Sequence, residues 1–194
     1  GAKVSLERQV DGTLAGGVTG WGAEGPKQPE GPIDCGNSGT TSRLLMGILA
    51  PWNIRVQITG DESLQKRPMR RIIAPLMKMG VSFELEACET LPVTEIGTSN
   101  LKAITYDSPM ASAQLKTSVL LAGLGAKGTT TINEPAVSRN HTELMLPEFG
   151  VKVEHAFRRA SVEGPVVLSA SEVDVPVDHK QDAFLIGAEL LMKA

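Results

Sequence analysis

The sequence is poor in the features that define several specialised classes of protein. Its 194 residues include two cysteines, Cys35 and Cys88, too few for a disulfide scaffold and typical of reduced thiols in a cytosolic protein. No apolar run reaches the roughly 20 residues that cross a bilayer. Residues 1–7 lack the apolar centre of a signal peptide. The histidines and cysteines have no zinc-type spacing, so no metal site is expected.

Positive charge is also scarce. The formal net charge is −3 and the pI is about 5.7, which argues against general binding to nucleic acid or to a membrane surface. The hydrophobic fraction of 41% and the charged fraction of 21% are those of an ordinary globular protein. We therefore expect a cytoplasmic protein with a packed core, and no nucleic-acid or membrane partner.

The predicted elements repeat in the same order after about 70 residues. Apolar residues at 3.6-residue spacing predict helices, and short apolar runs between turn residues predict strands. The first copy has strands at 32–35, 54–59, 80–85 and 91–96 and helices at 38–50 and 68–79. The second copy has strands at 103–107, 129–133, 150–154 and 161–168 and helices at 110–124 and 139–149. The predicted fold class is therefore α/β (α+β), built from repeated β-α-β-α-β-β modules.

Local signals mark the helix ends and the chain ends. Pro68 is expected at a first helical position and Ser138 as an N-cap, with Gly80 and Gly150 at helix C-termini. The Asp-Gly pair at residues 11–12 predicts a hairpin turn.

These signals divide the chain into four parts. Residues 1–32 are expected to be the end of a truncated first module plus a loop, because residues 1–7 are similar to the strands that close the other modules. Residues 33–100 and 101–170 are the second and third modules. Residues 171–194, with a strand at 173–176 and a helix at 183–193, are expected to begin another domain. We expect the chain to be a piece of a longer protein.

The segment 34–43 is the most informative part of the sequence. It predicts a strand end, a glycine-bearing turn and the first turn of a helix, where backbone N–H groups and the helix dipole favour an anion. Thr40, Thr41 and Ser42 add hydroxyl donors, and Arg43 adds a guanidinium suited to phosphate or carboxylate. The alternative is an ordinary N-capped helix with a solvated arginine.

Three further helix starts carry polar residues of this kind. Residues 66–71 include four cations, which oppose the helix dipole unless an anion is bound; a solvated charged face is the alternative. Residues 108–116 place Ser112 at the repeat position of Ser42, two residues before Gln114. Residues 134–143 place Ser138 and Arg139 at a predicted helix start. A small molecule that bears phosphate or carboxylate is therefore the expected ligand.

His141 and Glu143 lie next to this last segment and suggest acid–base chemistry. Two positions apart on a helix, they face different directions, so a structural role is expected for both.

These segments resemble the 5-enolpyruvylshikimate-3-phosphate synthase (3-phosphoshikimate 1-carboxyvinyltransferase) family. The resemblance covers about residues 1–194 and is most specific at 34–45, 60–69 and 112–116. It implies an enolpyruvyl transferase fold of two domains, with substrate between them, of which this chain carries mostly one. It also implies that the enolpyruvyl group of phosphoenolpyruvate moves to the 5-hydroxyl of shikimate 3-phosphate, in the shikimate pathway of aromatic amino acid biosynthesis. No metal or organic cofactor is implied, and glyphosate is implied as a competitor of phosphoenolpyruvate.

The resemblance assigns roles position by position. Asn37, Gly39, Arg67 and Gln114 fall on positions that bind phosphoenolpyruvate. The positions that bind shikimate 3-phosphate are occupied here by Ser112, Gln114, Ser138 and Arg139. The catalytic carboxylates of the family lie outside this chain, so no catalytic residue is expected in it. A complementing chain with the missing domain is an expected partner, and this chain alone is expected to bind weakly and not to turn over substrate.

Two departures leave alternatives open. Residues 139–144 lack the aspartate and final arginine that this branch of the family usually has, and residues 176–181 depart from its Pro-Gly-Asp-Pro-Ser-Ser crossover motif. One alternative is UDP-N-acetylglucosamine enolpyruvyl transferase, which carries a cysteine in the loop before its Arg-Pro pair; residues 61–66 contain none. The other is a non-catalytic fragment or remnant domain that binds phosphorylated small molecules.

Overall fold

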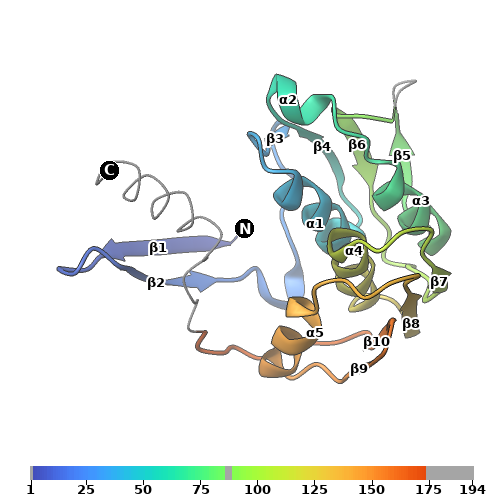
Figure 1. Cartoon of the computed structure of the whole chain (residues 1–194). Helices are drawn as coiled ribbons and strands as arrows, with labels where there is room; N and C mark the ends of the chain where they lie inside the picture. The colour runs from blue at the N-terminus through green and yellow to red at the C-terminus, as the bar shows by residue number, and fades with distance from the viewer. Residues whose placement is uncertain (1, 86–88, 174–194) are drawn as a thin grey trace, which may run out of the picture.

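Two modules with the same order of elements make up the body of the molecule. The computed structural model describes residues 2–85 and 89–173 (Figure 1). The first of the two modules comprises β3 (Ile33–Asp34), α1 (Gly39–Leu49), β4 (Arg55–Thr59), α2 (Glu62–Gln65), α3 (Arg70–Met79), β5 (Ser82–Glu84) and β6 (Val93–Ile96). The second comprises β7 (Thr105–Asp107), α4 (Ala113–Gly123), β8 (Gly128–Asn133), α5 (His141–Met145), the 3₁₀ helix η2 (Leu146–Phe149), β9 (Val153–Ala156) and β10 (Arg159–Gly164).

The two sheets have the same topology. Their strand orders are β3-β4-β6-β5 and β7-β8-β10-β9. In each sheet the first strand pairs in parallel with the second, and the other pairs are antiparallel. The predicted repeat of β-α-β-α-β-β modules in an α/β fold is therefore confirmed.

The registers show which residues are equivalent between the modules. Asp34 pairs with Thr59 at the end of one parallel pair, and Asp107 pairs with Asn133 at the end of the other. The residue after each second strand is therefore Gly60 in one module and Glu134 in the other.

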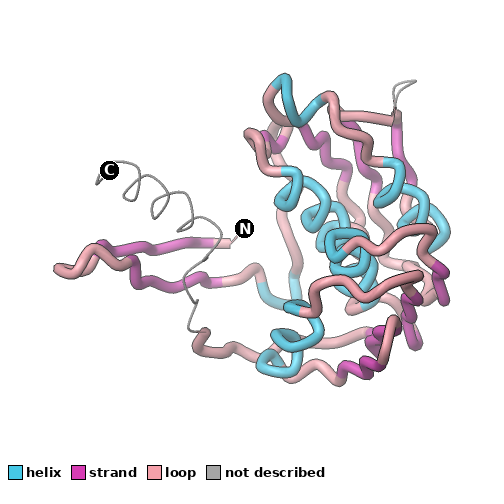
Figure 2. The backbone as a smooth tube through the Cα atoms, in the orientation of Figure 1, coloured by secondary structure: helices cyan, strands magenta, loops and turns pink. Residues whose placement is uncertain are grey.

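The N-terminal segment forms a separate hairpin. Its strands β1 (Lys3–Arg8) and β2 (Leu14–Thr19) pair antiparallel around a turn in which Gly12 has φ of +87°, so the predicted hairpin is confirmed. Figure 2 shows both strands extending away from the two modules. A single 3₁₀ turn, η1 (Gly22–Glu24), lies between this hairpin and β3.

Helices α1 and α4 pack directly on each other in the middle of the molecule (Figure 1). Gly47 makes this possible, because a Cβ there would lie 2.2 Å from the carbonyl oxygen of Ser118 in α4. The core around this crossing is apolar and joins both modules, and its large buried side chains include Met46, Ile58, Leu76, Leu115, Leu120 and Ile132. The close crossing sets the N-termini of α1 and α4 side by side, where the Gln114 side chain donates to Thr40 Oγ1 at 2.8 Å.

Three predicted helix starts are wrong. Helix α4 begins at Ala113, after its N-cap Ser112, and not at residue 110. Helix α3 begins at Arg70, because α2 and the turn after it, neither of which the apolar pattern predicts, occupy the chain up to Pro68. The N-cap position of α5 is Asn140, not Ser138, and it makes no side-chain capping hydrogen bond. After Met145 this helix tightens into η2, since Pro147 lacks the N–H that an α-helix would need.

The predicted C-termini of two helices are confirmed. Gly80 and Gly150 are left-handed, with φ of +110° and +81°, and each caps a helix through its backbone N–H.

Several predictions lie outside the described residues. They are the strand at 173–176, the helix at 183–193, the crossover motif at 176–181 and Cys88. Within the described part of the chain, every helix is too short or too polar to cross a membrane.

Candidate functional site

The start of α1 forms the first part of the site. Ser38 is the N-cap, and its Oγ accepts a hydrogen bond from the Thr41 N–H at 3.1 Å. Gly39, the first helical residue, lies against two guanidinium groups. A Cβ there would be 2.6 Å from Arg43 Nη1 and 3.3 Å from Arg67 Nη1. Glycine therefore lets two cations approach the N-terminus of the helix.

Arg43 is buried, so the alternative of a solvated arginine is wrong. It is 5% exposed and donates to Gln114 Oε1 at 3.0 Å and, at 3.4 Å each, to the carbonyls of Gly39 and Pro68. Arg71 donates to the same Gln114 oxygen at 3.0 Å. Burial, and then the charges of Arg71 and Arg67, lower the pKa of Arg43.

Arg67 and Asn37 face each other across the turn before α1. Arg67 Nη2 donates to Asn37 Oδ1 and, at 3.3 Å, to Ser63 Oγ. Asn37 Nδ2 in turn donates to Asp61 Oδ2 at 2.7 Å. The pKa of Asp61 is lowered, first by the Leu64 N–H that its carboxylate accepts as N-cap of α2 and then by Asn37. An open depression of about 710 Å³ beside Arg67 is lined by Asp61, Glu62, Ser63 and Lys66 as well.

Arg43, Arg67 and Arg71 together are called the arginine cluster below. Within residues 2–85 and 89–173, none of the three guanidinium groups forms an ion pair with a carboxylate. Asp61 lies one hydrogen-bonded residue, Asn37, away from Arg67, whose charge helps to lower the Asp61 pKa. Positive charges without a direct ion-pair partner beside a helix N-terminus favour a bound anion. The structure thus brings Asn37, Gly39 and Arg67 into direct contact, and Gln114 joins them through Arg43.

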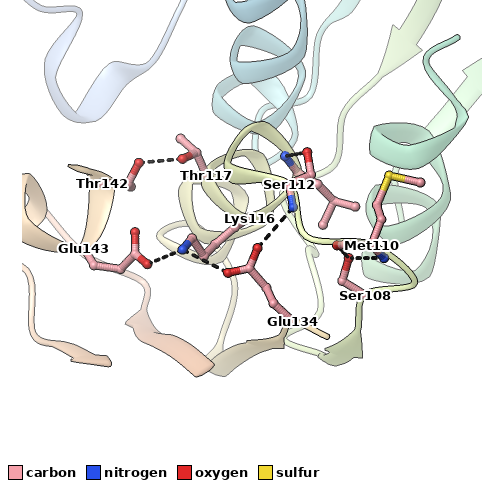
Figure 3. Close-up of polar contacts among 9 residues, drawn as sticks. Ser108, Met110, Ser112, Lys116, Thr117, Glu134, Thr142 and Glu143 are labelled. Carbon is pink, nitrogen blue, oxygen red and sulfur yellow. Dashed lines mark hydrogen bonds and ion pairs between the residues drawn. The ribbon is translucent and has the colours of Figure 1, made fainter. Parts of the chain in front are cut away.

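The start of α4 forms the second part. Ser112 is its N-cap, and its Oγ accepts from the Leu115 N–H at 3.3 Å. Its counterpart in α1 is therefore the N-cap Ser38, and the predicted equivalence with Ser42 is wrong. Equivalent residues are 74 positions apart at these N-caps and at the ends of the second strands, but 70 apart at Gly80 and Gly150. A uniform repeat of 70 residues therefore misplaces Ser112 by about one helical turn. The Ser112 backbone N–H donates to Glu134 Oε1 at 3.2 Å (Figure 3).

Sequence reasoning missed a buried ionic cluster beside Ser112. Lys116 Nζ lies 3.0 Å from Glu134 Oε2 and 2.7 Å from Glu143 Oε1, and the three side chains are 3–5% exposed. These three residues are called the Lys116 triad below. A signal did exist, since Lys116 stands among Leu115, Val119 and Leu120 on the buried side of α4. Glu143 is buried and His141 is exposed, so their predicted separation is confirmed.

Ser138 and Arg139 lie in the loop of residues 135–140. A cavity of about 240 Å³ is lined by Ser138 together with the Lys116 triad. Ser138 Oγ and Glu143 Oε2 are both buried there without a hydrogen-bond partner in the described part of the chain. Arg139 is exposed. Glu134 thus lines the cavity together with Ser138 and also accepts the Ser112 N–H, whereas Arg139 is not among the residues that line the cavity.

The fold and these two parts of the site define a class: a repeat-built α/β protein with two adjoining polar helix starts, one of them beside three guanidinium groups. The sequence pattern of the EPSP synthase (3-phosphoshikimate 1-carboxyvinyltransferase) family matches residues 15–193. The chain therefore belongs to this family of transferases.

Individual relatives agree with the family assignment. The 3-phosphoshikimate 1-carboxyvinyltransferases of Alkalilimnicola ehrlichii and Bacillus subtilis are 47% and 46% identical over 93% and 88% of this chain. An EPSP synthase structure from Acinetobacter baumannii superposes with a TM-score of 0.84 over 93% of this chain, at 42% identity. The chain spans 40–41% of the length of these relatives.

Proposed function

We propose that this chain supplies part of the active site of a 3-phosphoshikimate 1-carboxyvinyltransferase. The reaction moves the enolpyruvyl group of phosphoenolpyruvate to the 5-hydroxyl of shikimate 3-phosphate and releases phosphate. The observation that carries the proposal is the arginine cluster beside Gly39, none of whose guanidinium groups forms an ion pair with a carboxylate of the described residues. Both substrates are anions that such a site stabilises.

In this proposal, Asn37, Gly39, Arg67 and Gln114 bind phosphoenolpyruvate. Arg67 offers a planar fork of donors for a carboxylate or phosphate. The absence of a side chain at Gly39 keeps the N–H groups of the first helical turn accessible. Gln114 is held in place by Arg43, Arg71 and Thr40.

Shikimate 3-phosphate is proposed to bind at the α4 side, to Ser112, Gln114, Ser138 and Arg139. The unpartnered Ser138 hydroxyl supports this assignment, because a buried donor without a partner is costly unless a ligand or water satisfies it. Ser112 uses an oxygen lone pair for its helix cap, which leaves its O–H free to donate.

We also propose that the chain works with a complementing segment. The four-part division at residues 1–32, 33–100, 101–170 and 171–194 belongs to this proposal. One face of the hairpin carries exposed Val4, Leu6, Leu14 and Val18, with Val4 paired to Val18. In the other two modules, Phe83 of β5 and Val153 of β9 pack against the core and β6 and β10 are mostly buried, which supports a first module that other segments complete.

Complementation provides the test. The chain would be mixed with a polypeptide that carries the remaining parts of a relative, and phosphate release from phosphoenolpyruvate would be followed with and without shikimate 3-phosphate. We expect release that depends on shikimate 3-phosphate and is absent for either polypeptide alone. No release by a mixture that forms a stable complex would overturn the proposal. Release with UDP-N-acetylglucosamine instead would assign the chain to the related transferase.

A non-catalytic domain that binds phosphorylated small molecules is the second candidate. Binding of shikimate 3-phosphate, seen by titration calorimetry, without turnover in the complemented protein would select it. The proposed cytosolic location and the need for no cofactor are shared by both candidates.

A further inference from the structure

One ammonium group holds both ends of the loop that carries Ser138 and Arg139. Glu134 directly follows β8 and Glu143 lies in the first turn of α5, so the loop of residues 135–140 runs between them. Lys116 Nζ contacts both carboxylates, at 3.0 and 2.7 Å (Figure 3). The ends of the loop therefore cannot move apart without breaking a buried ion pair.

The same group of residues reaches the start of α4. Glu134 uses its second oxygen, Oε1, to accept the Ser112 N–H at 3.2 Å. A second contact between α4 and α5, beside the ion pair of Lys116 with Glu143, is the hydrogen bond between Thr117 Oγ1 and Thr142 Oγ1 at 2.5 Å. The two segments proposed to bind shikimate 3-phosphate are thus connected through Glu134 and Lys116, although 26 positions separate Ser112 from Ser138.

Burial fixes the geometry of the contacts that Lys116 makes with Glu134 and Glu143. The three side chains of the Lys116 triad are 3–5% exposed, so water cannot replace the contacts as it does at the surface. A buried ion pair is weak evidence for net stability, because its desolvation opposes its attraction, but its geometry is strongly specified. The equivalent positions of the first module hold Ser42 and Gly60, which cannot form such a pair.

We propose that Lys116 is a positioning residue that sets the spacing between Ser112 and the loop of Ser138 and Arg139, so that both segments grip one phosphorylated ligand. The identity of that ligand, shikimate 3-phosphate, rests on the proposed function. The contacts that join Ser112 to the loop of residues 135–140 do not depend on the proposed function. Lys116 acts through its contacts with Glu134 and Glu143.

Hydrogen exchange of the unliganded 194-residue chain tests the connection without any ligand. The neutral triple variant Lys116→Met/Glu134→Gln/Glu143→Gln keeps the side-chain sizes and leaves no buried charge unpaired. We expect the amides of Ser112 and of residues 138–143 to exchange about tenfold faster in this variant, while β3 and β4 keep their protection. The control Arg55→Met/Glu84→Gln removes an exposed ion pair and is expected to change neither region. Unchanged exchange, or equal acceleration throughout the chain, would overturn the proposal.

Titration with shikimate 3-phosphate then tests the positioning role. In the wild-type protein we expect the amide resonances of Ser112 and Ser138 to shift with one common Kd. In the folded triple variant we expect Kd to rise about tenfold or more, equivalent to roughly 1.4 kcal/mol, with the two resonances saturating at different concentrations. Unchanged affinity with a common Kd would overturn the role. If the wild-type protein binds no shikimate 3-phosphate, the proposed substrate fails and the positioning role for it fails as well, whereas the exchange data still decide whether the connection exists.

Discussion

The starts of α1 and α4 occupy equivalent places in two modules of one topology, yet their charges are arranged in opposite ways. At α1, the guanidinium groups of the arginine cluster meet no carboxylate in the described part of the protein. At α4, the ammonium of Lys116 meets two carboxylates within 3.0 Å. The same topology therefore supports guanidinium groups without a carboxylate ion-pair partner at one helix start and an ammonium between two carboxylates at the other. Charge balance, not topology, separates the two.

The largest expected effect comes from removing the charge of Lys116, and it is an effect on stability. Lys116→Met leaves Glu134 and Glu143 buried without their cation, and we expect it to lower the free energy of unfolding by about 3–5 kcal/mol. Urea denaturation followed by circular dichroism measures the change. The matched control is Arg55→Met, whose partner Glu84 is exposed, and a loss within about 1 kcal/mol is expected there. Similar losses for both variants would contradict the contrast between internal and surface charge.

The next largest effect is expected from removing one guanidinium of the arginine cluster at the start of α1. This change affects ligand binding and not stability. We expect Arg67→Met to weaken binding of phosphoenolpyruvate by about 10- to 100-fold, since a hydrogen bond to a charged group contributes roughly 1.5–3 kcal/mol. Stability is expected to stay within about 0.5 kcal/mol, because Arg67 pairs with no carboxylate in the described residues. Calorimetric titration at two salt concentrations measures both affinity and its screening. Unchanged affinity would remove Arg67 from the proposed site.

The two sheets also differ at one buried position, which is Glu95 in β6 of the first module. It is 1% exposed, and neither carboxyl oxygen has a hydrogen-bond partner among the described residues. The equivalent position in β10 is Val162, as the pairing of β6 with β4 and of β10 with β8 shows. Glu95→Val is therefore expected to raise the free energy of unfolding by about 1–3 kcal/mol near neutral pH.

The gain at Glu95 is expected to depend on pH. Burial raises the pKa of the Glu95 carboxyl well above its ordinary value, so the folded state holds a proton that the unfolded state releases. The penalty in the wild-type protein is small below the ordinary carboxyl pKa and grows as the pH rises toward the raised value. Melting curves of the wild type and of Glu95→Val should therefore diverge between pH 4 and pH 8. A constant difference across that range would show that Glu95 does not titrate differently in the folded state.

The smallest expected effect comes from making the two helix starts alike. The counterpart of Gly39 in α4 is Ala113, the residue after the N-cap. Gly39→Ala places a methyl group within 2.6 Å of Arg43 Nη1 and must displace that guanidinium or its neighbour Arg67. We expect about tenfold weaker phosphoenolpyruvate binding, or roughly 1.4 kcal/mol, with the helix retained because alanine favours it. Unchanged affinity would show that the cations reposition without cost.

Much of the fold could be predicted because its signals are local. The hairpin at residues 11–12, the helix end at Gly80 and the repeat of elements each depend on short patterns of turn residues or apolar spacing. The start of α3 was missed because α2 has four residues, too few for an apolar period to appear. Ser112 was misaligned because the segment between β4 and Gly80, which contains α2, is four residues longer than the segment between β8 and Gly150, so the repeat is not uniform along the chain.

The candidate site could be predicted only in part. Polar helix starts identified Asn37, Gly39, Arg67, Gln114 and Ser138 as residues to examine, but not which of their neighbours are buried. Arg43 was expected either to bind an anion or to be solvated, and it is instead buried against Gln114, which lies 71 positions away. The partners of Lys116 lie 18 and 27 positions away, on elements that meet it only after β8 and α5 have packed.

The sequence by itself determined the modules, the hairpin and the residue types at each helix start, because propensity and turn chemistry act within a few residues. The tertiary structure alone decided which charges are neutralised. Gly47 lets α1 and α4 cross closely, and Gln114 at the start of α4 accepts hydrogen bonds from Arg43 and Arg71 of the first module. The packing of α5 and β8 against α4 encloses Lys116 between two carboxylates. Coulomb energy depends on distance and burial in space, and neither can be read from positions along the chain.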